Sequence, residues 1–135
     1  MSDIKLTKKS KSFVDISLAF GANPKTGDIS VLKNERAINQ SVKNIIMFIP
    51  GEVPFQHDIG SRVTDYLFES IDVGVAGLID VEIRRAIAYN EPRVEVVDVS
   101  VVPDETNHQY SCTVIYRIVG YDTTYTVDHL LKPTR

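Results

Sequence analysis

Residues 89–102 read YNEPRVEVVDVSVV, and this stretch marks the change from helical to β structure. Pro92 disfavours the α conformation in the residue before it, so the preceding helix is expected to end near Asn90. The segment that follows, Val94–Val102, is rich in β-branched residues and is predicted to be a strand. The stretch therefore predicts a helix, a sharp polar corner and a strand in direct succession.

Three helices are predicted before this corner. Asn34 can cap a helix from Glu35 to about Phe48. The segment Ser61–Glu69 fits a short second helix, and Asp72 can cap a long third one. Apolar residues at helical spacing predict one core-facing stripe on each helix. The predicted stripes are Ile38, Val42, Ile45 and Ile49; then Val63, Tyr66 and Leu67; then Ala76, Ile79, Ile83 and Ile87.

The last third of the chain is predicted to be β structure. In the first strand, the alternation of apolar and polar residues is interrupted between Val96 and Val97, which is typical of a β-bulge. Polar turns at Pro103–Gln109 and Gly120–Asp122 connect the strands and predict an antiparallel meander. Two further strands alternate, with inward faces formed by Cys112, Val114, Tyr116 and Ile118, and by Thr123, Tyr125 and Val127. The predicted fold class is α+β: an antiparallel sheet of three to four strands, covered on one face by two to three helices.

The N-terminal region leaves more than one interpretation open. Phe13–Phe20 alternates as a strand, which could pair within the chain's own sheet or reach a neighbouring protein. After a turn at Asn23–Gly27, Asp28–Val31 is either a short strand that closes a hairpin or the lead-in to a helix. Four lysines in residues 1–12 indicate either a solvated terminus or an arm for an acidic partner. We expect one domain over residues 1–135, with residues 1–12 a basic and flexible arm.

Size, charge and cysteine content narrow the class of protein. The chain has 135 residues and a net charge of −3, so we expect no nucleic-acid and no membrane partner. No apolar run is long enough to cross a bilayer, and residues 1–12 lack the apolar core of a signal peptide. The lone Cys112 is expected to be a core residue in a protein that folds in a reducing cytoplasm.

Few patterns in the sequence indicate catalysis. The three histidines, His57, His108 and His129, are scattered, and no spacing for a metal site or glycine-rich phosphate loop is present. We therefore expect no metal and no cofactor. Glycoside hydrolysis by two opposed carboxyl groups is the enzymatic alternative, although the chain has no tryptophan. Its candidate carboxylates are Asp58, Asp65, Glu69, Asp72 and Glu91.

The triplet Glu91-Pro92-Arg93 permits two interpretations. In the first, it ends the helix locally: Arg93 binds carbonyls at the helix end and Glu91 is solvated. In the second, Glu91 and Arg93 project from a proline-stiffened corner and dock on another protein, because a guanidinium fork and a carboxylate both form strong charge-assisted hydrogen bonds. Arg93 would also lower the pKa of Glu91, which disfavours Glu91 as a general acid.

The predicted sheet has open edges. Modest charge protects them, at Glu95, Asp98 and Arg117. Such an edge is either covered by the chain itself or completed by a strand from another protein.

The pattern as a whole resembles the small wedge subunit of contractile phage-tail baseplates, a family often labelled "lysozyme-like", with relatives in type VI secretion baseplates. The resemblance spans about residues 38–131. It is carried by Ile38–Ile46 (INQSVKNII), Pro54–Ser61 (PFQHDIGS), Leu67–Glu69 (LFE) and Ala86–Arg93 (AIAYNEPR), followed by a β-rich end. Glu91, Pro92 and Arg93 match the family's signature triplet, whereas residues 1–30 match no pattern of the family.

The resemblance implies a structural, non-enzymatic subunit in the virion's tail baseplate, made in the host cytoplasm and present in several copies per ring. Glu91, Pro92 and Arg93 would bind the helical core bundle of the larger wedge subunits. The β part would engage strands of the tail sheath protein and initiate sheath assembly; tail tube or hub proteins are further candidate partners. Two alternatives stay open: a peptidoglycan-cleaving hydrolase, or a subunit of a type VI secretion baseplate.

Overall fold

The computed structural model describes residues 14–16, 22, 24–25, 31–33 and 35–133. The chain divides into two compact units, residues 1–38 and residues 39–135. The expectation of one domain stays a prediction, and the predicted arm, residues 1–12, lies outside the described residues.

In the first unit, β1 (Val14–Ile16) pairs antiparallel with β2 (Val31–Lys33). An antiparallel partner strand for β1 is therefore present, as the hairpin interpretation expects, but it is described at residues 31–33, and only Val31 of the predicted Asp28–Val31 belongs to it. The remainder of the predicted strands, residues 13, 17–20 and 28–30, lies outside the described residues. β1 and β2 form a two-stranded sheet of their own, distinct from the larger sheet.

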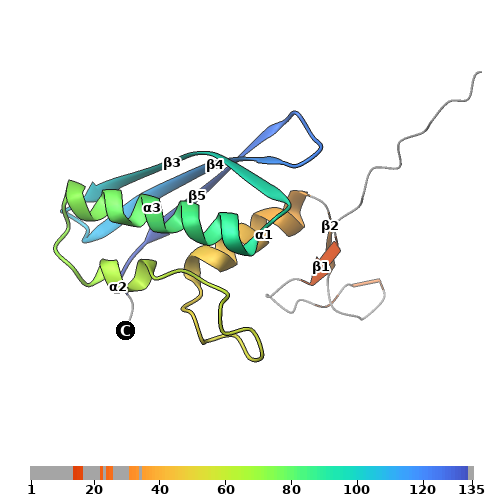
Figure 1. Ribbon diagram of the computed structural model, residues 1–135, viewed down its shortest axis with the longest axis horizontal. Coiled ribbons are helices and arrows are strands. Elements are labelled where there is room, and N and C mark those ends of the chain that lie inside the picture. Colours follow the sequence, from red (N-terminus) through yellow and green to blue (C-terminus); the bar gives the residue numbers. More distant parts are fainter. Residues whose placement is uncertain (1–13, 17–21, 23, 26–30, 34, 134–135) are drawn as a thin grey trace, which may run out of the picture. The chain divides into compact units, whose positions relative to one another are not determined.

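The larger sheet belongs to the second unit and is an antiparallel meander. Its strands β3 (Val94–Asp104), β4 (Gln109–Ile118) and β5 (Thr124–Leu131) lie in the order β3-β4-β5. Three helices precede it in the chain: α1 (Glu35–Met47), α2 (Val63–Leu67) and α3 (Val73–Asn90). Figure 1 shows α3 lying along the sheet. The predicted α+β class is confirmed.

One face of this sheet and the helices form the core. Register places Val99, Val114 and Val127 in one row across the three strands, and all three are buried. The helical side of this core consists of Val42, Ile45, Ile46, Val63, Leu67, Ala76, Ile79, Ile83, Ala86 and Ile87. Ala37 and Ile38, at the start of α1, are also buried. Burying each of the large aliphatic side chains stabilises the fold by roughly 1.5–3 kcal/mol relative to exposure. Tyr116 on β4 also donates a hydrogen bond to the side-chain oxygen of Asn39 on α1.

The structure corrects four details of the sequence prediction. Thr123, predicted to face inward, is exposed and precedes β5, which begins at Thr124. Ile49 is exposed, because α1 ends at Met47 and Ile46 supplies the last buried contact instead. Tyr66 is only half-buried on the short helix α2. Pro103 belongs to β3 and pairs with Tyr110, so the turn is shorter than predicted; the ring is tolerated because β3 is an edge strand.

The ends of α3 follow the predicted chemistry. Asp72 has an extended backbone, and its carboxylate accepts the backbone N–H of Val75 at 2.8 Å. The helix ends at Asn90, where the backbone N–H of Glu91 still reaches the carbonyl of Ile87. The predicted bulge is confirmed by a register shift between Val96 and Asp98.

Candidate functional site

The corner after α3 holds a buried ion pair. Arg93 Nε lies 2.6 Å from Glu91 Oε1, and Arg93 Nη2 lies 2.7 Å from Glu91 Oε2. The guanidinium group therefore donates two parallel hydrogen bonds to the carboxylate. The Glu91 side chain is 4% exposed and that of Arg93 is 25% exposed. Pro92, between them, is exposed.

Ser41 completes this cluster from a distant part of the chain. Its hydroxyl, on α1, donates to Glu91 Oε2 across 50 positions of sequence. The sequence prediction missed this contact. A signal was present, because Ser41 stands three residues after Ile38 and interrupts an otherwise apolar stripe. The corner thus connects the first helix to the end of the third.

Charge keeps Glu91 ionised despite its burial. Burial raises the pKa of Glu91, but the hydrogen bonds from Arg93 and Ser41, together with the Arg93 charge, outweigh it and lower the pKa below its ordinary value. The alternative in which Glu91 is solvated is wrong, since the residue is 3% exposed. Docking through Glu91, Pro92 and Arg93 stays a prediction, with Glu91 directed inward and Pro92 outward.

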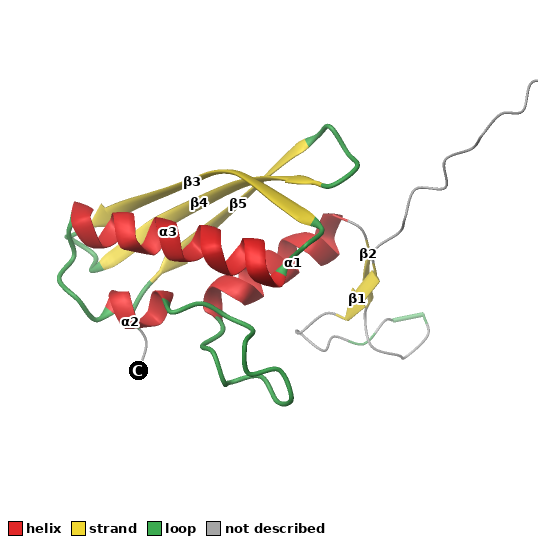
Figure 2. Cartoon of the chain, viewed as in Figure 1, coloured by secondary structure: helices red, strands yellow, loops and turns green. Residues whose placement is uncertain are grey.

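A compact loop lies beside the corner. We call residues 48–61 the Phe55 loop; it is drawn in green between α1 and α2 in Figure 2. Its two ends meet, because Ser61 donates its backbone N–H to the carbonyl of Phe48 at 2.9 Å and its hydroxyl to the carbonyl of Ile46 at 2.7 Å. Such closure defines an Ω-loop, a class that is frequently functional.

Gly60 permits this closure. Its φ is +126°, and a Cβ at this position would lie 2.3 Å from the carbonyl oxygen of Phe48. Asn90, the last residue of α3, adds a side-chain N–H that faces the carbonyl of Gly60 at 3.5 Å. The neck of the Phe55 loop is therefore tied to α1 and lies against the end of α3.

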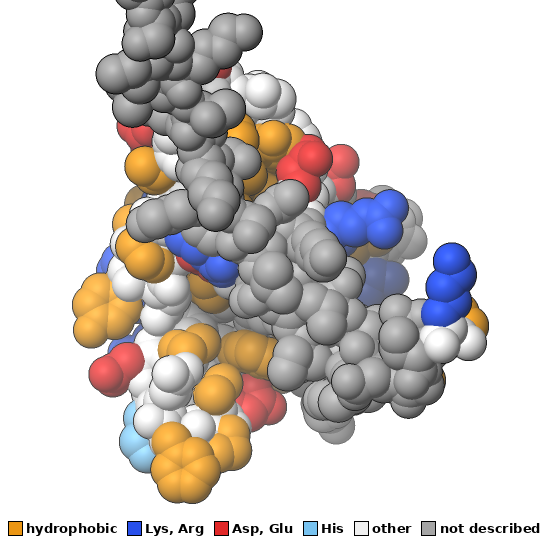
Figure 3. Space-filling view, turned by 90° about the vertical axis from the view of Figure 1, so that its right-hand side faces the viewer, with side chains coloured by type: hydrophobic (Ala, Val, Ile, Leu, Met, Phe, Trp, Pro, Cys, Tyr) orange, Lys and Arg blue, Asp and Glu red, His pale blue; other side chains and the backbone are white. Residues whose placement is uncertain are grey.

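Phe55 at the far part of this loop is the most exposed large apolar residue among those described. The residue is 97% exposed, and its φ is +66°. A bulky residue in this left-handed region is an outlier that costs on the order of 1–3 kcal/mol. Figure 3 shows one face of the molecule, on which hydrophobic side chains gather at the lower left. Folding gains nothing from an aromatic ring held in this way, so the position calls for another explanation.

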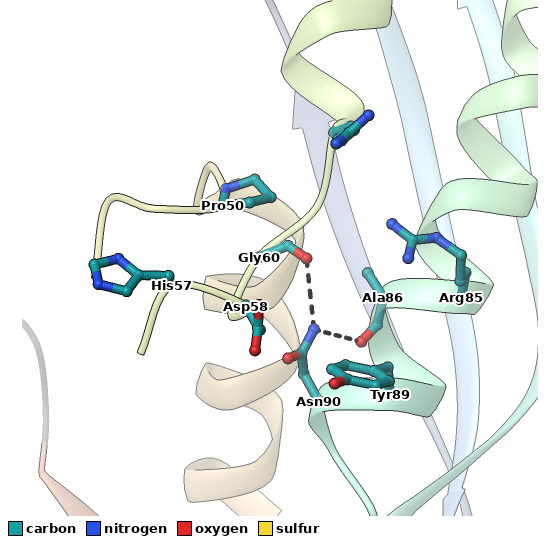
Figure 4. Close-up of a pocket in the computed structure, with 9 residues that line it drawn as sticks. Pro50, His57, Asp58, Gly60, Arg85, Ala86, Tyr89 and Asn90 are labelled. Atoms are coloured by element: carbon teal, nitrogen blue, oxygen red, sulfur yellow. Dashed lines mark hydrogen bonds between the residues drawn. The ribbon is translucent and has the colours of Figure 1, made fainter. Parts of the chain in front are cut away.

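A pocket of about 290 Å³ lies between the Phe55 loop and α3. Figure 4 shows Pro50, His57, Asp58 and Gly60 on the loop side, and Arg85, Ala86, Tyr89 and Asn90 on the helix side. Arg62, just after the loop, also lines it. The pocket is therefore framed by two guanidinium groups, one carboxylate and an exposed tyrosine.

A buried glutamate organises the basic side of this pocket. Glu82 is 8% exposed and accepts the backbone N–H of Arg62 at 2.9 Å. It also accepts two hydrogen bonds from Arg85, at 2.7 and 3.1 Å. The Arg85 hydrogen bond, assisted by the Arg62 backbone, lowers the pKa of Glu82 against the opposing effect of burial. Sequence analysis did not single out Glu82, although it lies between Ile79 and Ile83 on the core side of α3.

The candidate carboxylates for hydrolysis have separate surroundings. Asp58 lines the pocket, whereas Asp72 is used as the cap of α3. Asp65 is exposed on α2. Glu69 is also exposed but lies beyond the end of α2, which is shorter than the predicted helix Ser61–Glu69. Glu91 is sealed in its ion pair. The pocket therefore does not bring two of these carboxylates to its wall.

Other chemistry is equally sparse in the described part of the chain. No three His, Cys, Asp or Glu residues among those described form a group that could hold a metal ion. Cys112 is a core residue as predicted, and burial raises the pKa of its thiol to about 12. Within the described residues, no helix has both the length and the apolarity needed to cross a lipid bilayer.

The two edges of the three-stranded sheet differ. On β3, Arg84 from α3 donates to the carbonyl of Val99 at 3.2 Å and to Asp98 at 3.0 Å, next to the bulge. Pro103 further along this strand has no N–H to donate. β5 pairs with β4 in an unbroken register from Thr124 to Leu131, and no described strand pairs with its other side. Of the two edges, β5 is the more regular.

Comparison with known proteins places the chain among baseplate components. Baseplate wedge protein gp25 of Enterobacteria phage T4 is 32% identical over 76 residues, which are 56% of this chain and 58% of the T4 protein. The chain thus matches less than two thirds of the length of that relative.

Two solved structures share the fold. A crystal structure from Geobacter sulfurreducens, described as a tail lysozyme, has a TM-score of 0.65 and 25% identity, covering 73% of this chain and 89% of the other. A chain in the cryo-EM structure of the anti-feeding prophage baseplate has a TM-score of 0.63 and 21% identity, covering 92% of this chain and 88% of the other. The family described as baseplate wedge protein gp25 matches residues 32–123, which include the corner and the Phe55 loop. The chain belongs to this family of baseplate wedge proteins.

Proposed function

We propose that the chain is a structural wedge subunit in the baseplate of a contractile phage tail or a related injection machine, and that it works in the assembled virion. The observation that carries the proposal is the family match over residues 32–123, which spans both the corner and the Phe55 loop. Its partners would be other baseplate proteins, first among them the larger wedge subunits.

The geometry of the corner supports docking through Pro92 and Arg93. Glu91 uses both carboxylate oxygens within the chain, so its part is to hold the Arg93 guanidinium at a fixed angle. Pro92 is exposed beside it, and a quarter of the Arg93 side chain is exposed. A rigid corner loses little conformational entropy when it binds, which favours recognition by a helical bundle.

A structural role also agrees better with these residues than hydrolysis does. A general acid for glycoside cleavage needs a raised pKa and access to substrate. Glu91 has neither, because Arg93 and Ser41 lower its pKa and the residue is buried. We infer that the fold similarity to a protein described as a tail lysozyme reflects shared architecture without shared chemistry.

The difference between the sheet edges supports β5 as the strand that meets the tail sheath. A foreign strand adds to an edge through its backbone N–H and carbonyl groups. Three features obstruct the edge of β3: the charged side chain of Arg84, the β-bulge and Pro103. Charged side chains, bulges and prolines are known to protect edge strands from the addition of a foreign strand. β5 has a regular register and no proline. A sheath strand would therefore extend the sheet beyond β5.

Co-expression with the larger wedge subunits of the same baseplate tests the docking. We expect wild type to retain those subunits on a column and Arg93→Ala to retain fewer. Because this substitution also leaves the buried Glu91 without its partner, the comparison is made below the melting transition of the variant, with circular dichroism as the check of its fold. Arg117→Ala is the matched control, since Arg117 also pairs with a glutamate, at 2.5 Å, but on the sheet face away from the helices. If Arg93→Ala retains as much wedge protein as wild type, docking through the corner is contradicted. If wild type itself retains none, the wedge function is contradicted.

Photo-crosslinking with the sheath protein tests the edge. Leu130 on β5 and Val102 on β3 lie in the same row of the sheet, both facing away from the helices and both about half exposed. With benzoylphenylalanine at each position in turn, we expect crosslinks to the sheath from position 130 and not from position 102. The reverse pattern would contradict the assignment of β5.

A further inference from the structure

We propose that the Phe55 loop is a second docking element, which inserts the Phe55 ring into an apolar socket on a wedge subunit while a carboxylate of that subunit enters the pocket beside Arg62 and Arg85. The choice of partner rests on the proposed function. The existence of the element rests on the loop itself.

Strain and exposure together mark Phe55. The residue combines φ +66° with an exposed fraction of 97%, so it has an unfavourable backbone and no core contact to offset it. The neck of the loop holds this arrangement through Ser61 and the glycine that permits its approach to Phe48. Strained residues that the surrounding structure maintains occur preferentially at functional sites. Aromatic residues, phenylalanine among them, are also enriched in protein interfaces relative to the rest of the surface.

Charge decides the kind of partner. Residues 48–61 carry Glu52 and Asp58 and contain no lysine or arginine, so an anionic lipid surface would repel the tip of the loop. Of the two guanidinium groups that line the pocket at its base, Arg85 is already bound by both oxygens of Glu82. Arg62 is therefore the group on the pocket wall that is placed to meet a carboxylate of the partner, with Asp58 on the loop side. This combination fits a protein surface that offers an apolar socket with a carboxylate next to it.

The loop and the corner can be reached by the same partner. Asn90 lines the pocket and directly precedes Glu91, and its side chain contacts the neck of the loop. Tyr89 on the same turn is 71% exposed and adds an apolar rim. A helical bundle that rests on Pro92 and Arg93 would therefore lie next to the neck of the Phe55 loop, from which the same partner could extend to Phe55.

The test compares Phe55→Asn with Phe68→Asn in the full chain. Asn adopts the left-handed conformation more readily than Phe, so Phe55→Asn is expected to leave the melting temperature unchanged or raise it. Phe68 is the matched control, an exposed phenylalanine with an ordinary right-handed backbone outside the loop. With the wedge subunits co-expressed, we expect Phe55→Asn to lower the retained wedge protein at least tenfold and Phe68→Asn to leave it unchanged.

The pocket has its own pair of variants. Arg62→Glu keeps the backbone N–H that Glu82 accepts but reverses the charge on the pocket wall. We expect it to lower retention, whereas Arg117→Glu on the opposite side of the sheet leaves retention at the wild-type level.

Several results would overturn the inference. If wild type and Phe55→Asn retain equal amounts of wedge protein, the loop is no docking element although the proposed function stands. A melting temperature lowered as much as by a core substitution would make Phe55 a structural residue. Self-association, or binding to anionic phosphatidylglycerol vesicles, that Phe55→Asn abolishes would assign the loop to another partner. If wild type retains no wedge subunit, the proposed function fails, and the partner named here fails with it.

Discussion

The corner at residues 91–93 and the Phe55 loop lie next to each other and use their side chains in opposite ways. At the corner, the charged groups turn inward: Glu91 is 3% exposed and is held by Arg93 and Ser41. In the loop, an apolar side chain turns outward, with Phe55 97% exposed on an unfavourable backbone. The contrast teaches that the charged motif builds the shape of the corner, whereas Phe55 is not part of the core and leaves its ring open to a partner.

Glu91→Gln is expected to have the largest effect on folding. It removes the negative charge of the carboxylate to which Arg93 and Ser41 both donate hydrogen bonds. Breaking a buried ion pair in this way lowers the free energy of unfolding by about 3 kcal/mol. Urea denaturation measures the loss. Glu95→Gln breaks a more exposed pair with Arg117 and should change the stability little. Equal losses in the two variants would mean that the corner is not a structural centre, and the comparison between corner and loop would fail.

Acid pH should remove the contribution of the Glu91 ion pair to the free energy of unfolding. The pKa of Glu91 is lowered in the folded state, so its stabilising effect is full above the ordinary glutamate pKa and is lost as pH falls through the lower, folded value. The difference in stability between wild type and Glu91→Gln is therefore expected to be constant near neutral pH and to shrink at acid pH. Denaturation curves from pH 7 to pH 2 measure it. If the difference in stability between the two proteins grew as the pH falls, the pKa of Glu91 would be raised and not lowered in the folded state.

Gly60→Ala tests whether the neck of the loop is as rigid as its contacts indicate. The new methyl group would overlap the carbonyl of Phe48 in a backbone that disfavours any side chain, which together cost roughly 2–3 kcal/mol. Gly51→Ala is the matched control, since Gly51 has φ +94° with open space around it and adds strain alone. Thermal melting of both proteins should show the larger loss at position 60. Equal losses of melting temperature would imply that the backbone at the neck of the loop moves to accommodate the added methyl group.

Ser41→Ala should give the smallest of these effects. It removes one hydrogen bond to an ionised carboxylate that keeps its two bonds to Arg93, a loss of about 1.5 kcal/mol. Ser111→Ala, at an exposed position on β4, should be neutral. If Ser41→Ala were as damaging as Glu91→Gln, the tie between α1 and the corner would outweigh the ion pair.

The sequence predicted the elements better than the direction of their side chains. Pro92 and the change of period fix where α3 ends and β3 begins, because both signals are local. The burial of Glu91 depends on Ser41, fifty residues away, and nothing local indicates it. Ile49 continues the apolar spacing of α1 but lies beyond the end of the helix, so spacing alone misplaced it.

The candidate site was predicted only in part for a similar reason. The triplet was found because charge and proline stand together in the sequence. The Phe55 loop was predicted only as a loop, since its closure requires contacts of Ser61 with Phe48 and Ile46, and no rule predicts a positive φ for phenylalanine. The pocket joins residues from two segments, so it becomes visible only in the folded chain.

The most direct test is hydrogen exchange of the chain alone and of the chain bound to its larger wedge subunits. We expect binding to slow the exchange of backbone amides in residues 49–60 and around Arg93, and to leave β3 and β4 beyond the corner unchanged. Protection confined to other surfaces, with both of these segments exchanging as fast as in the free chain, would contradict a docking site formed by the corner and the Phe55 loop.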